Sequence, residues 1–247
     1  MIGSKRHHAG TGAVADRHRK KIRFFWIIPS VYQGPISVFS GIVEDLGEVK
    51  SIRRSDQGAT LTIRTALSLA KIKIGDSICT SGVCLTVTAK GRGTISMEVS
   101  AETLRRSTLG ALQPGARVNL ERSLTLGSLI GGHLVSGHVE GTGRVVSIRS
   151  EGDSKLYTFE APAKESRYLL EKGSVTLDGV SLTVFGIEGA RFSVELIPHT
   201  LAVTTLGAKA VGDQINYESD LLGKYIEKFV AARFEAQRGI SAGGEAA

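Results

Sequence analysis

Two short stretches of alternating residues carry side chains that could act as nucleophiles. In Cys84-Leu-Thr-Val-Thr88, alternation places Cys84, Thr86 and Thr88 on one face of a strand and two aliphatic side chains on the other. Ser181 and Thr183 share a face in the same way. A thiol or hydroxyl on such a face can add to an electrophilic carbon if a base lies nearby. Hydroxyls on the wet face of a strand are also ordinary, so neither stretch defines a site by itself.

Both stretches belong to a repeat that covers most of the chain. Ser81-Gly-Val-Cys-Leu-Thr-Val-Thr88 returns as Asp178-Gly-Val-Ser-Leu-Thr-Val-Phe185, at an offset of 97 residues. Ser40-Gly-Ile-Val-Glu44 returns as Ser136-Gly-His-Val-Glu140, at an offset of 96 residues. This period is too long for a solenoid and fits two tandem copies of one domain. We therefore expect two similar binding sites, with chemistry where the copies differ.

Three differences give the second copy acid–base groups that the first lacks. They pair Ile42 with His138, Ser123 with Asp220, and Ser81 with Asp178. Imidazole titrates near neutral pH, and carboxylates can hold or move protons. Each of these residues also fits an ordinary surface or turn position. Together with the thiol in the first copy, they predict two pockets of like shape and unlike reactivity.

Alternating apolar residues between turn residues predict six short strands in each copy. The predicted strands are 47–52, 59–63, 77–79, 84–88, 94–99 and 116–120, then 144–148, 156–160, 174–176, 181–184, 192–196 and 214–217. Short helical pieces are predicted at 67–71, 102–107 and 164–171, and after His199. Such short antiparallel strands fit small closed barrels. The sequence predicts an all-β protein with two tandem six-stranded Greek-key barrels and a C-terminal α-helix.

The end of the chain changes to a helical period. Its apolar stripe consists of Leu221, Leu222, Tyr225, Ile226, Phe229, Val230 and Phe234. Ser219 or Asp220 can cap the start of this helix. The stripe fits packing on the chain's own barrel or an oligomerisation helix, and we favour the second because the first copy has no counterpart. The predicted divisions are an extension at 1–37, barrels at 38–133 and 134–218, the helix at 219–237 and a tail at 238–247.

The net charge of +7 over 247 residues is concentrated at the start of the chain. Residues 1–37 carry +6, so the remaining body is nearly neutral and gives no basis for a phosphate-binding surface. The first segment is predicted to be disordered, with a nucleic-acid arm or an organelle presequence as weaker alternatives. Valine can be encoded by the start codon GUG, so we expect translation to begin at Val38.

Cys79 and Cys84 are the two cysteines, and five positions apart on one strand they would face opposite ways. We expect no disulfide, a reducing compartment and a cytoplasmic protein. Their spacing is not that of a CxxC metal motif. His133 and His138 are the other nearby soft ligands, and we expect no metal site.

Five motifs, in the same order along the chain, closely resemble the riboflavin synthase family. They are Phe39-Ser-Gly-Ile-Val-Glu44, Gly82-Val-Cys-Leu-Thr-Val-Thr88, Ile130-Gly-Gly-His-Leu-Val-Ser-Gly-His138, Asp178-Gly-Val-Ser-Leu-Thr-Val184 and Leu196-Ile-Pro-His-Thr-Leu201. The resemblance covers about Val38 to Phe234 and departs in the basic extension. It implies dismutation of two 6,7-dimethyl-8-ribityllumazine molecules into riboflavin and 5-amino-6-(D-ribitylamino)uracil, with no metal or organic cofactor. It also implies a homotrimer, held by the C-terminal helices, that works between the N-barrel of one subunit and the C-barrel of its neighbour.

The resemblance also carries site residues over to this chain. The implied catalytic residues are Cys84, His138, Ser181, Thr183 and Asp220. The implied substrate-binding residues are Gly41, Ile42, Val43, Cys84, Leu85, Thr86, Glu98, Val99, Ser100, Ala101, Glu102, Thr103, Gly137, His138, Val139, Lys172, Ser181, Leu182, Thr183, Glu195, Leu196, Ile197, Pro198, His199 and Thr200. A non-catalytic lumazine- or flavin-binding antenna protein is the alternative function. Association with lumazine synthase is left open.

Overall fold

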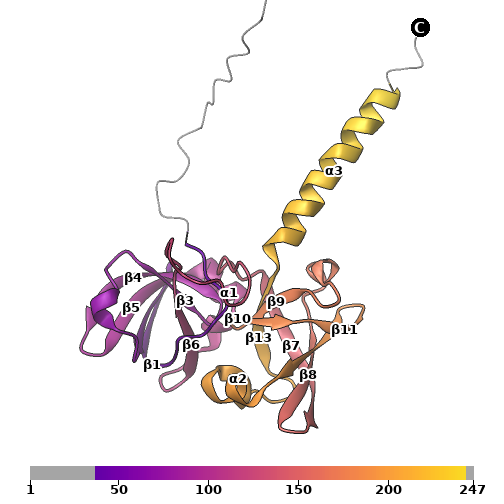
Figure 1. Ribbon diagram of the computed structural model, residues 1–247. Helices are drawn as coiled ribbons and strands as arrows, with labels where there is room; N and C mark the ends of the chain where they lie inside the picture. The colour runs from indigo at the N-terminus through magenta and orange to yellow at the C-terminus, as the bar shows by residue number, and fades with distance from the viewer. Residues whose placement is uncertain (1–36, 243–247) are drawn as a thin grey trace, which may run out of the picture. The chain divides into compact units, whose positions relative to one another are not determined.

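A computed structural model describes residues 37–242, which form two β-structured halves and a C-terminal helix (Figure 1). In the first half, six strands close into a barrel in the order β1-β2-β5-β4-β3-β6. The strands are β1 (Asp45–Ser55), β2 (Gly58–Arg64), β3 (Ser77–Thr80), β4 (Val83–Gly91), β5 (Thr94–Ser100) and β6 (Arg117–Arg122). Short helices η1 (Leu69–Lys71), α1 (Ala101–Arg106) and η2 (Thr108–Ala111) lie between them. The barrel closes because β1 pairs with both β2 and β6.

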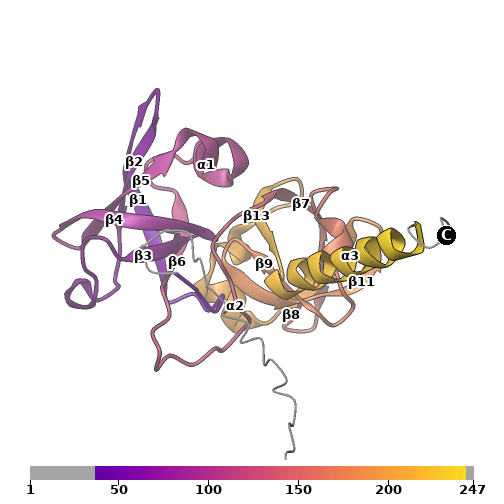
Figure 2. The ribbon, with the colours of Figure 1, turned by 90° about the horizontal axis from the view of Figure 1, so that it is seen from above.

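The second half lies beside the first in Figure 2 and repeats its arrangement, with one strand divided in two. Its strands follow the order β10-β9-β13-β7-β8-β12-β11. They are β7 (Gly141–Glu151), β8 (Ser154–Glu160), β9 (Ser174–Leu177), β10 (Val180–Thr183), β11 (Phe185–Glu188), β12 (Arg191–Leu196) and β13 (Gln214–Ser219). The helical segments are η3 (Ser166–Tyr168), α2 (Pro198–Val203) and η4 (Thr205–Ala208). The strands at the two ends of this order, β10 and β11, are consecutive in the chain, and only Val184 lies between them.

The predicted fold class is confirmed, and the divided strand is a difference in detail. The first half has one continuous strand, β4, where the second has β10 and β11. Gly186 has a φ of +61°, a left-handed conformation that interrupts regular strand geometry. The pairing of β11 with β12 is accordingly irregular between Phe185 and Glu188. The hydrogen-bonded ring of the second half is open between β10 and β11.

Alternation along the strands builds a separate apolar core in each half. Leu85 and Val87 of β4 are buried in the first core, whereas Thr86 and Thr88 are exposed, as the pattern predicted. The second core is more aromatic and stacks the rings of Tyr157, Phe159 and Phe192. Burial of these side chains is the main source of stability in both halves.

Cys79 and Cys84 do not share a strand, so they do not face opposite ways as they would on one strand; the strands predicted at 77–79 and 84–88 already separated them. Cys79 lies on β3 and Cys84 on β4, and they are directly opposite each other in an antiparallel register. Both are free cysteines. The turn at Ser81-Gly82, where both residues have positive φ angles, separates the two strands.

The segments that precede β1 and β7 are exchanged between the halves. The Gly41 carbonyl accepts a hydrogen bond from the Ser181 N–H at 2.8 Å, and the Gly137 carbonyl accepts one from the Cys84 N–H at 2.8 Å. Val43 packs on the second core and Val139 on the first. The predicted substrate-binding residues 41–43 and 137–139 therefore contact the barrel of the other repeat.

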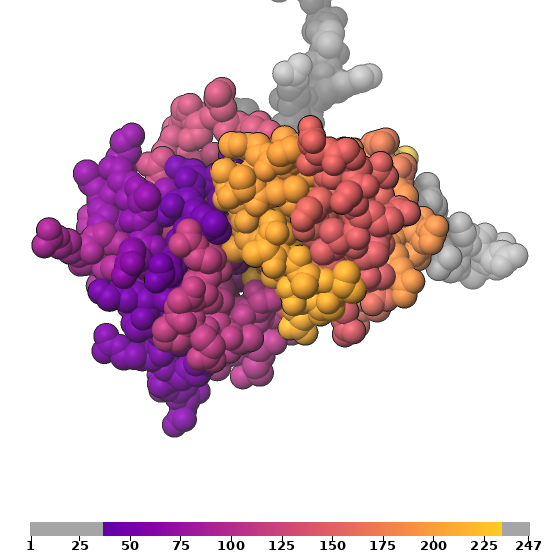
Figure 3. Space-filling view, turned by 90° about the horizontal axis from the view of Figure 1, so that it is seen from below, coloured from indigo at the N-terminus to yellow at the C-terminus, as the bar shows by residue number. Residues whose placement is uncertain are grey.

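Two equivalent buried asparagines join the two halves, whose surfaces meet in Figure 3. The Asn119 side chain donates to the Asp178 carbonyl at 2.8 Å and accepts from the Thr205 N–H at 2.8 Å. The Asn216 side chain donates to the Ser81 carbonyl at 2.7 Å and accepts from the Thr108 N–H at 2.7 Å. The two halves are thus held by reciprocal buried hydrogen bonds, which fix their register more than apolar contact alone does.

The C-terminal helix α3 (Leu221–Ala242) begins two residues later and ends five residues later than predicted. The Asp220 carboxylate accepts a hydrogen bond from the Leu222 N–H at 3.0 Å, which confirms it as the capping residue. Helix α3 exposes the apolar side chains of Leu222, Tyr225, Ile226, Phe229 and Val230. No helix in the described part of the chain has the length and apolar character to span a membrane. The predictions for residues 1–36 and for the end of the tail lie outside the described residues.

Candidate functional site

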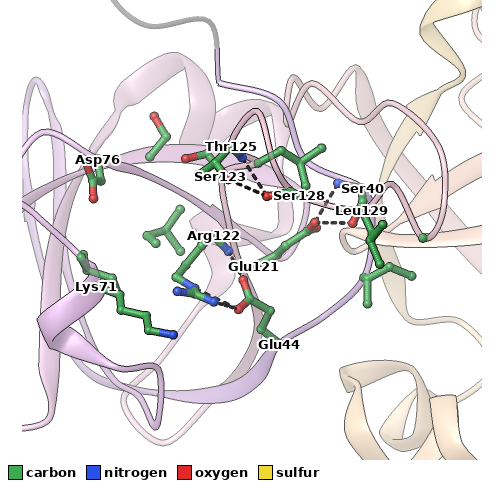
Figure 4. A pocket seen from close by; sticks show the side chains of 16 residues that line it. Ser40, Glu44, Lys71, Asp76, Glu121, Arg122, Ser123, Thr125, Ser128 and Leu129 are labelled. Carbon is green, nitrogen blue, oxygen red and sulfur yellow. Dashed lines mark hydrogen bonds and ion pairs between the residues drawn. The ribbon is translucent and has the colours of Figure 1, made fainter.

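A buried carboxylate fixes each exchanged segment. Glu121 accepts hydrogen bonds from the Ser40 N–H at 2.7 Å, the Ser40 hydroxyl at 2.8 Å and the Gly41 N–H at 3.0 Å, as Figure 4 shows in part. Glu218 accepts the same three bonds, with the same distances, from Ser136 and Gly137. Burial raises the pKa of both carboxyl groups, and these hydrogen bonds oppose the shift. The two carboxylates therefore determine where the chain crosses between the halves.

Glycine is required at both crossing points. Gly41 has a φ of +76°, and a Cβ atom there would lie 2.6 Å from the Ser181 Cβ. Gly137 has a φ of +74°, and a Cβ atom there would lie 2.7 Å from the Cys84 Cβ. Glycine adopts this conformation without strain and permits the close approach. The two glycines thus bring each exchanged segment onto the reactive position of the opposite barrel.

The first candidate site is centred on Cys84. This half-buried thiol lies beside the segment that ends in His138, an exposed side chain next to Gly137. Thr86 and Glu98 are exposed on the neighbouring strands β4 and β5. Burial raises the pKa of the Cys84 thiol, whereas hydrogen bonds from the Ser77 and Ser37 hydroxyls lower it. The structure therefore places the backbone that precedes His138 against Cys84, whereas Ser181 contacts the segment at Gly41.

The second candidate site is centred on Ser181. Its hydroxyl lies 2.7 Å from Nδ1 of His133, and Nε2 of that ring lies 3.1 Å from the Thr176 hydroxyl. Burial lowers the pKa of His133, and the negative charge of Asp220 opposes the shift. Sequence reasoning considered His133 only as a metal ligand. The repeat could have indicated its role, because His133 is three residues before Ser136, as Ser37 is before Ser40.

The remaining predicted residues lie at the ends of β5 and β12 and in the helices that follow. Ser100 caps α1 by accepting from the Thr103 N–H at 3.1 Å, and Glu102 forms ion pairs with two arginines. In the second half Glu195, Ile197, Pro198 and His199 are exposed, and Thr200 is half-buried. These groups are available to a ligand that approaches from solvent.

Lys172 lies in a left-handed conformation in the loop before β9. Its φ is 62°, and its Nζ atom lies 5.2 Å from the centre of the Phe185 ring. The side chain is exposed. A cation over this aromatic ring is held near the surface of the second half, where a neighbouring molecule can reach it.

A cavity of about 650 Å³ opens beside Ile42 in the first half (Figure 4). Lys71 and Asp76 line one side, and the Arg122–Glu44 ion pair lines the other. The equivalent groove in the second half is lined by Tyr168, Asp220 and the α3 side chains Ile226 and Val230. Helix α3 thus lines the second groove, whereas Leu124, Thr125 and Leu129, which follow β6, line the first cavity.

The described residues contain no group of three His, Cys, Asp or Glu side chains that could hold a metal ion. The polar groups at the two sites are instead a thiol, a serine hydroxyl, imidazoles and carboxylates. This set is suited to proton transfer and to addition at carbon. The exposed threonines, glutamates and backbone groups are suited to binding a polar ligand.

The model of one protein family matches both halves of the chain. It is described as the lumazine binding domain, and it covers residues 40–123 and 136–220. The fold agrees with that of LumP, whose complex with riboflavin aligns with a TM-score of 0.69 at 24% identity over 73% of this chain and 98% of LumP. LumP complexed with 6,7-dimethyl-8-(1'-D-ribityl) lumazine gives a TM-score of 0.66 at 22% identity, with the same coverage. The halves are two lumazine-binding domains.

Similarity to curated proteins identifies the family more narrowly. The riboflavin synthase of Mycobacterium bovis is 47% identical over 197 residues, which cover 78% of this chain and 98% of that protein. The riboflavin synthase of Actinobacillus pleuropneumoniae is 42% identical over 193 residues, and these cover 78% of this chain and 90% of that protein. That of Bacillus subtilis is 37% identical over 193 residues, with the same coverage. The chain belongs to the riboflavin synthase family.

Proposed function

We propose that the protein converts two molecules of 6,7-dimethyl-8-ribityllumazine into riboflavin and 5-amino-6-(D-ribitylamino)uracil. The observation that carries this proposal is the pair of repeat-related sites with unlike reactive groups, Cys84 with His138 and Ser181 with His133. A dismutation needs two binding sites for the same kind of molecule, and the reactive groups at the two sites must differ. Family membership supports the same conclusion.

The chemistry divides between a donor and an acceptor ring. The lumazine ring is electron-poor, so its C7-methyl protons are acidic enough for a modest base to remove one. A nucleophile adds to the other ring and makes it an acceptor. Holding the two rings face to face supplies an entropic advantage of about 7–11 kcal/mol at most. Cys84, His138, Ser181, Thr183 and Asp220 are the side chains we assign to these steps.

We also propose that the working site forms between the N-barrel of one subunit and the C-barrel of another in a homotrimer. The exposed groups Thr86, Glu98 and His138 would then contact a ligand that the neighbouring barrel also holds. The exposed apolar face of α3 supports association through this helix. Sedimentation of the wild type and of Ile226→Asp tests it: the wild type should be a trimer and the variant a smaller species. A monomeric wild type would contradict the proposal.

The reaction itself is tested with purified protein, 6,7-dimethyl-8-ribityllumazine and a chelator in plain buffer. Riboflavin is followed by its absorbance, and both products are identified by chromatography. We expect one pyrimidine product for each riboflavin, without added cofactor. Tight lumazine binding without riboflavin would place the protein with the non-catalytic antenna proteins.

A further inference from the structure

His133 is held rigidly against Ser181 by groups on three different segments. Its backbone N–H donates to the Ser40 carbonyl at 3.1 Å, and Ser40 is itself fixed by Glu121. Its ring lies between the Ser181 hydroxyl at 2.7 Å and the Thr176 hydroxyl at 3.1 Å. Thr176 is a buried residue of β9, 1% exposed, so the His133 ring contacts a side chain inside the second half. This geometry leaves the imidazole one orientation toward Ser181.

The first half has no imidazole at the equivalent position. Ser37 corresponds to His133, and its hydroxyl donates to the Ser77 hydroxyl at 2.7 Å beside the Cys84 thiol. A thiol ionises far more readily than a serine hydroxyl, which becomes nucleophilic only with an adjacent base. The histidine therefore occurs in the half whose reactive group needs one.

The environment of His133 is suited to accepting a proton and then releasing it. Burial favours the neutral ring, in which one nitrogen accepts and the other donates. The two contacts fit the tautomer in which Nε2–H donates to Thr176 and Nδ1 accepts from Ser181, the tautomer that the proposal requires. The charge of Asp220 favours the imidazolium that proton transfer produces.

We propose that His133 is the general base for Ser181, an assignment that rests on the proposed lumazine dismutation. The Ser181 Oγ forms a bond to a ring carbon of the acceptor lumazine, and its O–H bond breaks. The proton passes to Nδ1 of His133, and the electron pair of the attacked ring double bond moves onto a ring nitrogen. The reverse steps return the proton to Ser181 when the bond to the ring breaks. His133 acts through Ser181 and is a positioning residue for the ring chemistry.

A double-mutant cycle with chemical rescue tests this assignment. His133→Ala should lower kcat about 100-fold, a typical contribution of a general base, while KM changes much less. In a Ser181→Ala background the same change should cost less than about two-fold, because the base then has no proton to accept. Added imidazole should raise the turnover of His133→Ala and leave His133→Ala/Ser181→Ala and the wild type unchanged.

Two further measurements keep the inference refutable if the alanine variant folds poorly. His133→Asn keeps a polar group near Nδ1 without its basicity, so turnover close to wild type in this variant would overturn the proposal. Nitrogen-15 NMR of the wild type should show Nδ1 of His133 unprotonated and Nε2 protonated, and the opposite tautomer would also overturn it. A wild type that makes no riboflavin would refute the proposed function itself, whereas an active wild type with equally active His133 variants refutes only this inference.

Discussion

A buried ion pair in the second half, at a position where the first half has none, gives a sharp test of how the two copies differ. Asp178 is 2% exposed, and its carboxylate lies 3.0 Å from the Lys209 Nζ atom and accepts from the Asn216 N–H at 2.8 Å. The first half has Ser81 and Leu112 at the two equivalent positions. The Ser81 hydroxyl there accepts from the Asn119 N–H at 3.1 Å. One half thus holds an ion pair where the other holds a hydroxyl and an apolar side chain.

Lys209→Leu leaves the Asp178 carboxylate buried without its cation. Breaking a buried pair costs about 3–5 kcal/mol, and we expect about 3 kcal/mol because part of the Lys209 side chain is exposed. Asp178→Ser/Lys209→Leu recreates the first-half pair and should recover most of this loss. Urea unfolding followed by circular dichroism measures both free energies.

The loss in Lys209→Leu should depend on pH in a defined direction. Burial raises the pKa of Asp178, and Lys209 opposes the shift, so removing the lysine raises it further. A group whose folded pKa is raised contributes stability that is present below its unfolded pKa and is lost as pH rises through the folded pKa. The deficit relative to wild type should therefore shrink as pH falls from 7 toward about 4. A double variant no more stable than Lys209→Leu, or a deficit independent of pH, would refute the reasoning.

Three other outcomes follow from the crossing segments and the reactive groups. Glu218→Ala leaves three backbone and hydroxyl donors without their acceptor and should lower the unfolding free energy by about 3 kcal/mol. The control Glu151→Ala, at the exposed end of β7, should change it by less than about 0.5 kcal/mol in the same urea titration. Gly137→Ala introduces a clash with Cys84 and a left-handed strain, so calorimetry should show a loss above about 2 kcal/mol. Cys84→Ser and His138→Ala should each lower riboflavin turnover more than lumazine affinity, and wild-type rates in both would remove them from the site.

The sequence predicted the elements well where local patterns control them. Alternation along Cys84–Thr88 correctly separated the buried Leu85 and Val87 from the exposed threonines. The helical stripe after Asp220 correctly indicated α3 and its cap. These features depend on the periodicity of apolar residues and on residues adjacent in the chain, and both can be seen in the sequence itself.

The repeat determined that the chain holds two like domains with unlike reactive groups, because duplicated spacing survives in the sequence. It did not show that residues 39–43 contact the second half and residues 135–139 the first. The offset between the copies would be the same if each segment contacted its own half. Only the tertiary structure placed His133, and not His138, against Ser181. That contact is formed by segments 48 residues apart, and its position depends on the Glu121 and Gly41 hydrogen bonds of a third segment. Pairwise approach of this kind is set by packing and buried hydrogen bonds, which leave no periodic trace along the chain.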